Sequence, residues 1–127
     1  MSIYVCLRYR DCPAAIEFLT NAFGFERVVV HEEDGVVHHA ELRLGDSMVM
    51  VGSDREDGVH GNRVGLGWSY IGIDGTDALF ERAKAAGAEV VREPFDTDYG
   101  SRDFTVRDPE GNMWMLGTYD PATSASA

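Results

Sequence analysis

The feature that most constrains the fold of this 127-residue chain is an internal repeat of about 64 residues. The letters MVMVG at residues 48–52 recur as MWMLG at residues 113–117, and Gly24 has a counterpart in Gly87. A repeat of this length holds one supersecondary unit, which must pack against its neighbour to bury its apolar face. The sequence therefore predicts two similar modules within one small domain and excludes a multidomain architecture.

Both copies predict the same order of elements, β-α-β-β-β. In the first copy, residue alternation and turn formers predict strands at 3–9, 27–31, 36–44 and 47–51, and a helix between Asp11 and Gly24. In the second copy, they predict strands at 68–73, 89–92, 102–107 and 113–118, a helix capped by Thr76 that runs to Ala86, and a loop through Pro94.

We therefore predict an α+β fold in which tandem βαβββ modules, residues 3–52 and 67–119, form a curved mixed sheet around a cleft. Residues 1–120 are expected to form a single domain, with 121–127 as a flexible tail. The glycine-rich stretch 52–67 is expected to be a mobile connecting loop.

Acidic residues outnumber basic ones by 22 to 11, for a net charge of −11 spread over both copies. Such a charge excludes nucleic acid and anionic membranes as partners. It serves solubility or, alternatively, attracts a cationic partner. No apolar run reaches the ~20 residues of a membrane span, and the N-terminus lacks a signal peptide, so a cytoplasmic location is expected. Cys6 and Cys12 match no metal or disulfide motif and are expected to be buried or idle thiols.

Three further segments identify a family resemblance. Asp11 opens a helix that contains AAIEF and is followed by AFGF; HAEL at 39–42 precedes Gly45-Asp46; and YGSR at 99–102 precedes the turn DPEGN at 108–112. In this order and spacing they resemble the vicinal oxygen chelate superfamily, also called the glyoxalase/bleomycin-resistance/dioxygenase group, over residues 3–119. The chain looks most similar to PhnB-like and bleomycin-resistance-like members. The resemblance implies an open cleft between paired modules and a homodimer. We interpret the DPEGN turn as structural.

Metal-dependent members of this group carry four His, Glu or Gln ligands on the inner strands. Carried over by position, those sites fall on Tyr4, Met50, Trp68 and Met115, with Ser69 as an alternative to Trp68. Indole has no lone pair to donate, and thioether suits Cu(I) better than Zn²⁺ or Fe²⁺. We therefore expect no metal site and no cofactor, which argues against lactoylglutathione lyase, extradiol dioxygenase and metal-dependent fosfomycin resistance.

The cleft is then expected to be aromatic and methionine-rich. If the all-apolar strand faces cover the helices, the opposite faces present Tyr4, Cys6, Arg8, Met48, Met50, Trp68, Tyr70, Met113 and Met115. The same residues would equally suit a core or a dimer interface. His39 shares its face with Glu41 and is the better cleft candidate, whereas His38 is expected on the buried side. Arg102 either anchors an anionic ligand or forms a salt bridge.

Three functions fit these observations. The favoured one is a metal-independent small-molecule-binding protein that sequesters an aromatic or cationic antibiotic-like compound. The alternatives are a metal-free isomerase or lyase that acts on a small metabolite, and a vestigial structural module. The sequence does not identify a nucleophile with a neighbouring base, so no catalytic residue is assigned.

Overall fold

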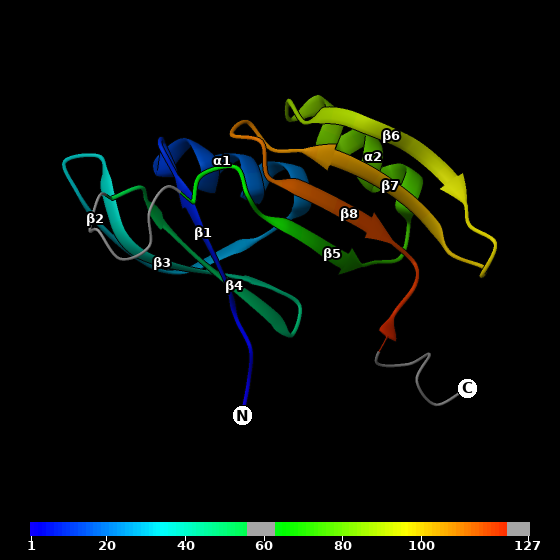
Figure 1. The fold of residues 1–127 in the computed structure, drawn as a ribbon, viewed down its shortest axis with the longest axis horizontal. Coiled ribbons are helices and arrows are strands. Elements are labelled where there is room, and N and C mark those ends of the chain that lie inside the picture. Colours follow the sequence, from blue (N-terminus) through cyan, green and yellow to red (C-terminus); the bar gives the residue numbers. More distant parts are fainter. Residues whose placement is uncertain (56–62, 122–127) are drawn as a thin grey trace.

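The computed structural model describes residues 1–55 and 63–121, and within them it contains the two predicted βαβββ modules side by side (Figure 1). The first module consists of β1 (Val5–Tyr9), α1 (Cys12–Phe23), β2 (Glu26–Glu33), β3 (Val36–Leu44) and β4 (Ser47–Ser53). The second consists of β5 (Trp68–Gly72), α2 (Thr76–Ala85), β6 (Glu89–Asp96), β7 (Arg102–Arg107) and β8 (Met113–Gly117). The prediction of an α+β fold with tandem modules is confirmed.

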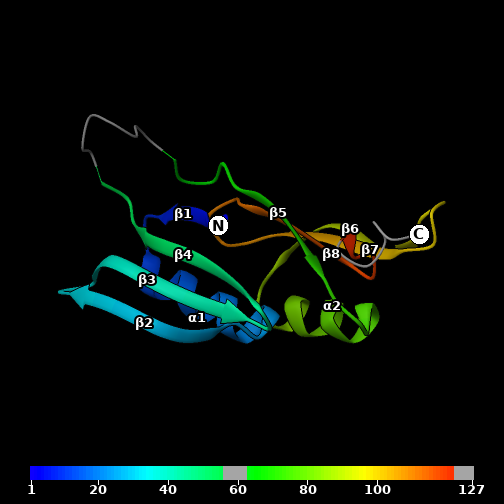
Figure 2. The ribbon, with the colours of Figure 1, turned by 90° about the horizontal axis from the view of Figure 1, so that it is seen from below.

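Each module forms its own four-stranded mixed sheet. The strand orders are β1-β4-β3-β2 and β5-β8-β7-β6, so the two copies share one topology. In each sheet the first and last strands of the module pair in parallel, and the remaining pairs are antiparallel. Figure 2 shows α1 and α2 next to each other along one side of the molecule. Within the described residues, no helix is long and apolar enough to span a membrane.

The two helices begin differently. Asp11 caps α1 as predicted, since its carboxylate accepts a hydrogen bond from the Ala14 amide, and Gly24 ends the helix in a left-handed conformation. The predicted cap of α2 by Thr76 is wrong. Gly75 occupies the cap position without a side-chain bond, because the buried Thr76 hydroxyl donates to the Arg102 carbonyl instead.

The strand faces follow the predicted alternation. Leu7 and Val51 are buried on the face that α1 covers, and Trp114 and Leu116 are buried in the second module. The residues between them, including Cys6, Met48, Met50, Met113 and Met115, are exposed or half-buried. The core therefore lies between the sheets and the helices, and the opposite sheet faces are open.

Three local predictions differ from the structure. The strand predicted at 3–9 begins only at Val5. β6 runs through Pro94, where a loop was predicted, because β6 is an edge strand whose pairing with β7 is irregular between Arg92 and Phe95. β4 extends to Ser53, into the predicted loop at 52–67. The rest of that loop lies partly outside the described residues, as do residues 122–127 of the predicted tail.

The DPEGN turn joins the two modules. The buried Asp108 carboxylate accepts hydrogen bonds from the Tyr9 hydroxyl at 2.6 Å and from Trp114 Nε1 at 3.1 Å. Glu110 accepts the backbone amides of Arg10 and Asp11 at the start of α1, at 2.5 and 2.8 Å. The turn is therefore structural in this protein, as predicted, and it fixes the second module to the start of the first helix.

Candidate functional site

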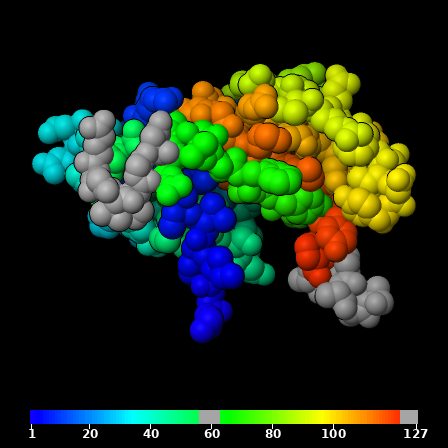
Figure 3. Space-filling view, in the orientation of Figure 1, coloured from blue at the N-terminus to red at the C-terminus, as the bar shows by residue number. Residues whose placement is uncertain are grey.

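A cleft of about 970 Å³ lies between the two modules, and we call it the intermodule cleft. It lies between the N-terminal segment, the β3–β4 turn and strand β5, beside the residues that follow β8. The space-filling view shows the surface hollowed there, between the N-terminal segment and the chain near Asp120 (Figure 3). A cleft of this volume accommodates a drug-sized organic molecule.

The intermodule cleft has polar and apolar walls, and three aromatic rings form one part of them. Phe23 and Phe25 line it from the end of α1, and Trp114 lines it from β8. The Trp114 ring lies 5.4 Å from the Phe23 ring and 6.0 Å from the Phe25 ring, centroid to centroid. These three rings are buried and packed on one another, so they form a rigid floor.

Three of the predicted ligand-binding residues, Tyr4, Met48 and Tyr70, line the intermodule cleft. Trp68, Met113 and Met115 lie on the adjoining open face of the second sheet, where Trp68 pairs with Met113 and Tyr70 with Met115. Trp68 is 72% exposed. The aromatic and methionine surface therefore continues from the cleft onto that sheet face.

The predicted residues Arg8, His39 and Met50 lie elsewhere, around a depression of about 80 Å³ on the open face of the first sheet. His39 Nε2 lies 2.8 Å from a Glu41 carboxylate oxygen, and the His31 ring stacks near it with centroids 6.4 Å apart. The structure thus brings His39 and Glu41 together on the open face, as predicted, but separates them from the aromatic cleft.

The expectation that His38 is buried is wrong. Its side chain is 58% exposed, and its imidazole lies 3.9 Å from Glu33. The cause is a β-bulge: His31 pairs with His39, whereas Glu32 pairs with Val37, so His38 is the extra residue. The bulge turns both adjacent histidines away from the helix, which a strict two-residue alternation could not predict.

The Arg102 side chain is paired with two acidic side chains. Its guanidinium forms ion pairs with Asp77 of α2 at 3.0 Å and with Asp96 of β6 at 3.1 Å. Hydrogen bonds to these two carboxylates raise the pKa of Arg102. The geometry favours the salt-bridge alternative, and we leave Arg102 out of the proposed site.

The donor set on the inner strands does not fit the metal ion of the metal-dependent relatives. The register pairs Met50 with Cys6 and Met115 with Tyr70, one alternation away from the Tyr4 and Trp68 assigned by resemblance. Either choice offers phenol, indole and thioether groups and at most a lone thiol, without imidazole or carboxylate. In residues 1–55 and 63–121, no group of three His, Cys, Asp or Glu side chains is arranged to hold a metal ion.

A polar cluster beside the cleft was not predicted as a site. The buried Asp103 of β7 accepts hydrogen bonds from Ser101 Oγ at 2.5 Å and from the Tyr99 hydroxyl at 3.3 Å. Tyr70 and Tyr119 pack edge to face at its border, with ring centroids 6.4 Å apart. The one signal for it in the sequence is a carboxylate near the start of a largely buried strand, a position that seldom tolerates an unpaired charge.

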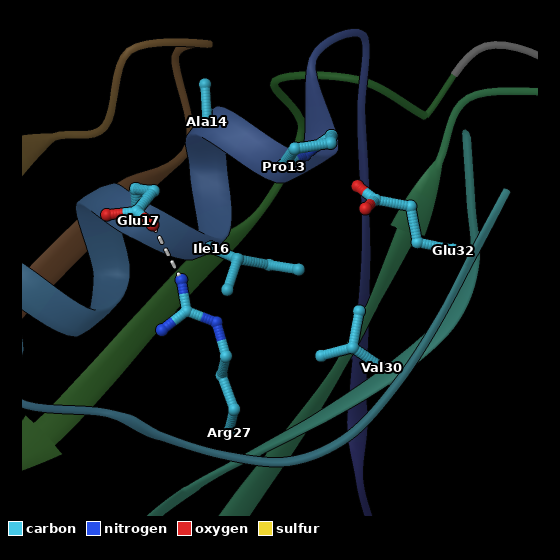
Figure 4. A pocket seen from close by; sticks show the side chains of 7 residues that line it. All are labelled: Pro13, Ala14, Ile16, Glu17, Arg27, Val30 and Glu32. Carbon is cyan, nitrogen blue, oxygen red and sulfur yellow. Dashed lines mark hydrogen bonds and ion pairs between the residues drawn. The ribbon is translucent and has the colours of Figure 1, made fainter. Parts of the chain in front are cut away.

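A second groove, of about 320 Å³, lies between α1 and β2 (Figure 4). Its apolar wall is formed by Ile16 and Val30, and the ion pair between Arg27 and Glu17, 2.9 Å long, lies along it. None of the predicted ligand-binding residues lines this groove, and we do not assign it a role.

The two thiols lie in different surroundings, so they should differ in reactivity. Burial raises the pKa of Cys12 to about 12, and the nearby Glu110 carboxylate raises it further, whereas Cys6 is exposed. A raised pKa leaves almost no thiolate at pH 8, and the thiolate is the reactive form. We expect a disulfide reagent at pH 8 to titrate one thiol per native chain and two in urea. Cys6→Ala should abolish the native reaction; persistent labelling of that variant would contradict the assignment.

Comparison with known proteins agrees with this architecture. The model of the Glyoxalase/Bleomycin resistance protein/Dioxygenase superfamily matches residues 3–116. Uncharacterized proteins of Mycobacterium bovis and Mycobacterium tuberculosis are each 35% identical over 115 residues, which cover 84% of this chain and 76% and 68% of theirs.

Solved structures extend the comparison to the fold. TioX from Micromonospora sp. ML1 superposes with a TM-score of 0.80 at 30% identity, over 92% of this chain and 97% of TioX. A glyoxalase/bleomycin resistance protein/dioxygenase family enzyme from Burkholderia phytofirmans PsJN has a TM-score of 0.69 at 22% identity, over 90% and 94% of the two chains, and shares the fold. The chain belongs to the glyoxalase/bleomycin resistance/dioxygenase superfamily.

Proposed function

We propose that this protein is a bleomycin-resistance-like member of its superfamily that captures a flat, antibiotic-like aromatic compound without a metal ion and without breaking a bond. The observation that carries this proposal is the intermodule cleft of about 970 Å³. The packed rings of Phe23, Phe25 and Trp114 line one side of it. Flat rings and adaptable methionines provide broad, non-directional contact with aromatic ligands.

Two further observations support capture. The donor set on the inner strands does not suit a catalytic divalent metal ion. Trp68, next to the cleft, is 72% exposed, and a large exposed aromatic side chain beside a concave surface is typical of a binding site. The same exposed face would be covered in the homodimer that the family resemblance implies, and we retain that homodimer as part of the proposal.

Binding of a neutral fluorescent aromatic probe, N-phenyl-1-naphthylamine, tests the proposal. We expect saturable binding with a dissociation constant on the order of micromolar, that is, about 8 kcal/mol of binding free energy. Tyr4→Ala should weaken binding about fivefold, because an aromatic contact contributes roughly 1 kcal/mol. Tyr4 is 50% exposed and lies outside the strands, so the variant should keep its fold.

Val91→Ala serves as the control, because Val91 is an exposed apolar residue of β6 that does not line the cleft. Its affinity for the probe should equal that of the parent protein. The absence of saturable binding up to the solubility limit of the probe, or equal binding by Tyr4→Ala and the parent, would contradict the proposal.

One observation favours a second candidate function, a metal-free isomerase or lyase. The contact between His39 and Glu41 places an imidazole beside a carboxylate that can orient it, as in a histidine general base. We place this function second because His39 faces a depression of only about 80 Å³, away from the aromatic cleft.

A further inference from the structure

Helix α1 has no basic residue of its own in its last turn, although a helix C-terminus carries partial negative charge and unpaired carbonyl groups. Two of these carbonyls accept hydrogen bonds from an arginine of the second module. Arg82 of α2 donates through Nε to the Asn21 carbonyl at 2.8 Å and through a terminal nitrogen to the Thr20 carbonyl at 3.2 Å. Arg82 therefore completes the end of a helix that belongs to the other module.

The Arg82 guanidinium group lies close against the glycine that ends α1. A Cβ atom on Gly24 would lie 3.3 Å from the nearest guanidinium nitrogen, so a larger residue at this position would crowd the group. Gly24 adopts a left-handed conformation, and its amide donates to the same Thr20 carbonyl that accepts from Arg82. The turn at the end of α1 is thus held both from within its own module and from the second module.

The same turn carries two of the rings that line the intermodule cleft. Phe23 and Phe25 flank Gly24 in the sequence, line the cleft and pack against Trp114 of β8. Arg82 and Trp114 both belong to the second module, so the turn contacts that module through a guanidinium group and through an indole ring. A displacement of the turn would move both phenylalanine rings relative to Trp114.

The second module also holds the other end of α1. Glu110 accepts hydrogen bonds from the amides of Arg10 and Asp11 beside the helix start, where the helix dipole is positive. The second module therefore contacts each end of α1 with a side chain of the charge that this end favours, and α2 lies next to α1 in Figure 2. Of these two contacts, the one from Arg82 lies next to residues that line the cleft.

We propose that Arg82 is a positioning residue of the intermodule cleft: from the second module it holds the end of α1 so that Phe23 and Phe25 stay packed on Trp114 in the arrangement that receives a flat ligand. Arg82 does not line the cleft, so it acts through these rings. Ring position matters because dispersion contacts weaken steeply when a gap opens between two surfaces. This inference rests on the proposed function and adds to it a residue that controls the affinity of the same site.

Arg82→Gln tests this role, and Lys84→Gln is the matched control. Both substitutions remove one positive charge from α2, but Lys84 pairs with Glu81 of its own helix. Arg82→Gln should bind N-phenyl-1-naphthylamine about fivefold more weakly than the parent protein, the effect of one aromatic contact, whereas Lys84→Gln should bind it as tightly as the parent. Arg82→Lys keeps the charge without the planar fork, so its affinity should lie between those of the parent and Arg82→Gln.

A double-mutant cycle separates positioning from a general loss of stability. A variant that is merely less stable still binds like the parent under conditions where it is fully folded, which urea unfolding of each variant checks. If Arg82 acts through the rings, Arg82→Gln should have no further effect on probe affinity once Phe25 is replaced by leucine. It should keep its full effect beside Tyr4→Ala, because Tyr4 lines the cleft from the N-terminal segment.

Equal probe affinities of Arg82→Gln and Lys84→Gln would overturn this inference and leave the proposed function standing. An undiminished effect of Arg82→Gln in a folded Phe25→Leu background would also overturn it. If Phe25→Leu does not fold, the comparison of Arg82→Gln with Lys84→Gln decides alone. Failure of the probe to bind the parent protein would overturn the proposed function and this inference together.

Discussion

Asp108→Ala is expected to reduce the free energy of unfolding by about 3–5 kcal/mol, the range for breaking a buried hydrogen-bond network. The Asp108 carboxylate receives five hydrogen bonds: from the Tyr9 hydroxyl, Trp114 Nε1 and Asn112 Nδ2, and from the amides of Glu110 and Asn112. Its removal leaves the buried Tyr9 hydroxyl and the buried Trp114 indole without these bonds. Burial, with the Asp108 charge adding to it, raises the pKa of Tyr9, so Tyr9 remains the protonated donor.

Urea unfolding followed by tryptophan fluorescence measures this loss, since Trp114 reports on the junction itself. Asp98→Ala is the matched control, because Asp98 is exposed and should change the stability by less than about 0.5 kcal/mol. Similar midpoints for Asp108→Ala and Asp98→Ala would show that the turn does not hold the modules together.

Gly117→Ala is the second substitution with a large expected effect. The new Cβ atom would overlap Asp103 Oδ1 and lie 2.7 Å from the Asp103 carboxyl carbon, which is buried and held by Ser101 and Tyr99. Overpacking of a core costs roughly 1–3 kcal/mol, and we expect the upper end because the displaced atom belongs to a buried carboxylate.

Gly72→Ala provides the comparison for Gly117→Ala. Gly72 is the cross-strand neighbour of Gly117 on β5, and its Cβ atom would lie 3.3 Å from the nearest atom, the Tyr119 carbonyl oxygen. Thermal unfolding should show a clearly smaller loss for Gly72→Ala. If both alanine variants unfold at the same temperature, the space at Gly117 is not reserved for Asp103.

The architecture was predictable because it depends on periodic patterns that the chain shows twice. Alternation placed Met48 and Met113 on the open faces, and turn formers marked Asp11, Gly24 and the DPEGN turn. The capping of α2 was not predictable, because the Thr76 hydroxyl bonds to the Arg102 carbonyl, which is distant in sequence. The bulge at His38 likewise depends on cross-strand register, which residue alternation alone does not determine.

The candidate site was predictable only in part. Strand faces predicted the residue types, but the division into an aromatic cleft with Tyr4 and Tyr70 and a separate depression with Arg8 and His39 depends on how the modules dock. The sequence did not predict the polar cluster of Asp103 and Ser101, because the hydrogen bonds that define this cluster appear only in the folded structure. For Arg102 the sequence allowed two roles, an anchor for an anionic ligand or a salt bridge. It could not decide between them because the two acidic partners of Arg102 lie on two different elements, α2 and β6.

The DPEGN turn also distinguishes the two ends of the seam between the modules. In the second copy, the β7–β8 turn reaches the start of α1 and binds its amides through Glu110. In the first copy, the equivalent β3–β4 turn is the shorter Gly45-Asp46, and it lines the intermodule cleft together with Asp74. The two copies therefore differ at this turn: in the second copy it closes the seam between the modules, and in the first copy it borders the intermodule cleft.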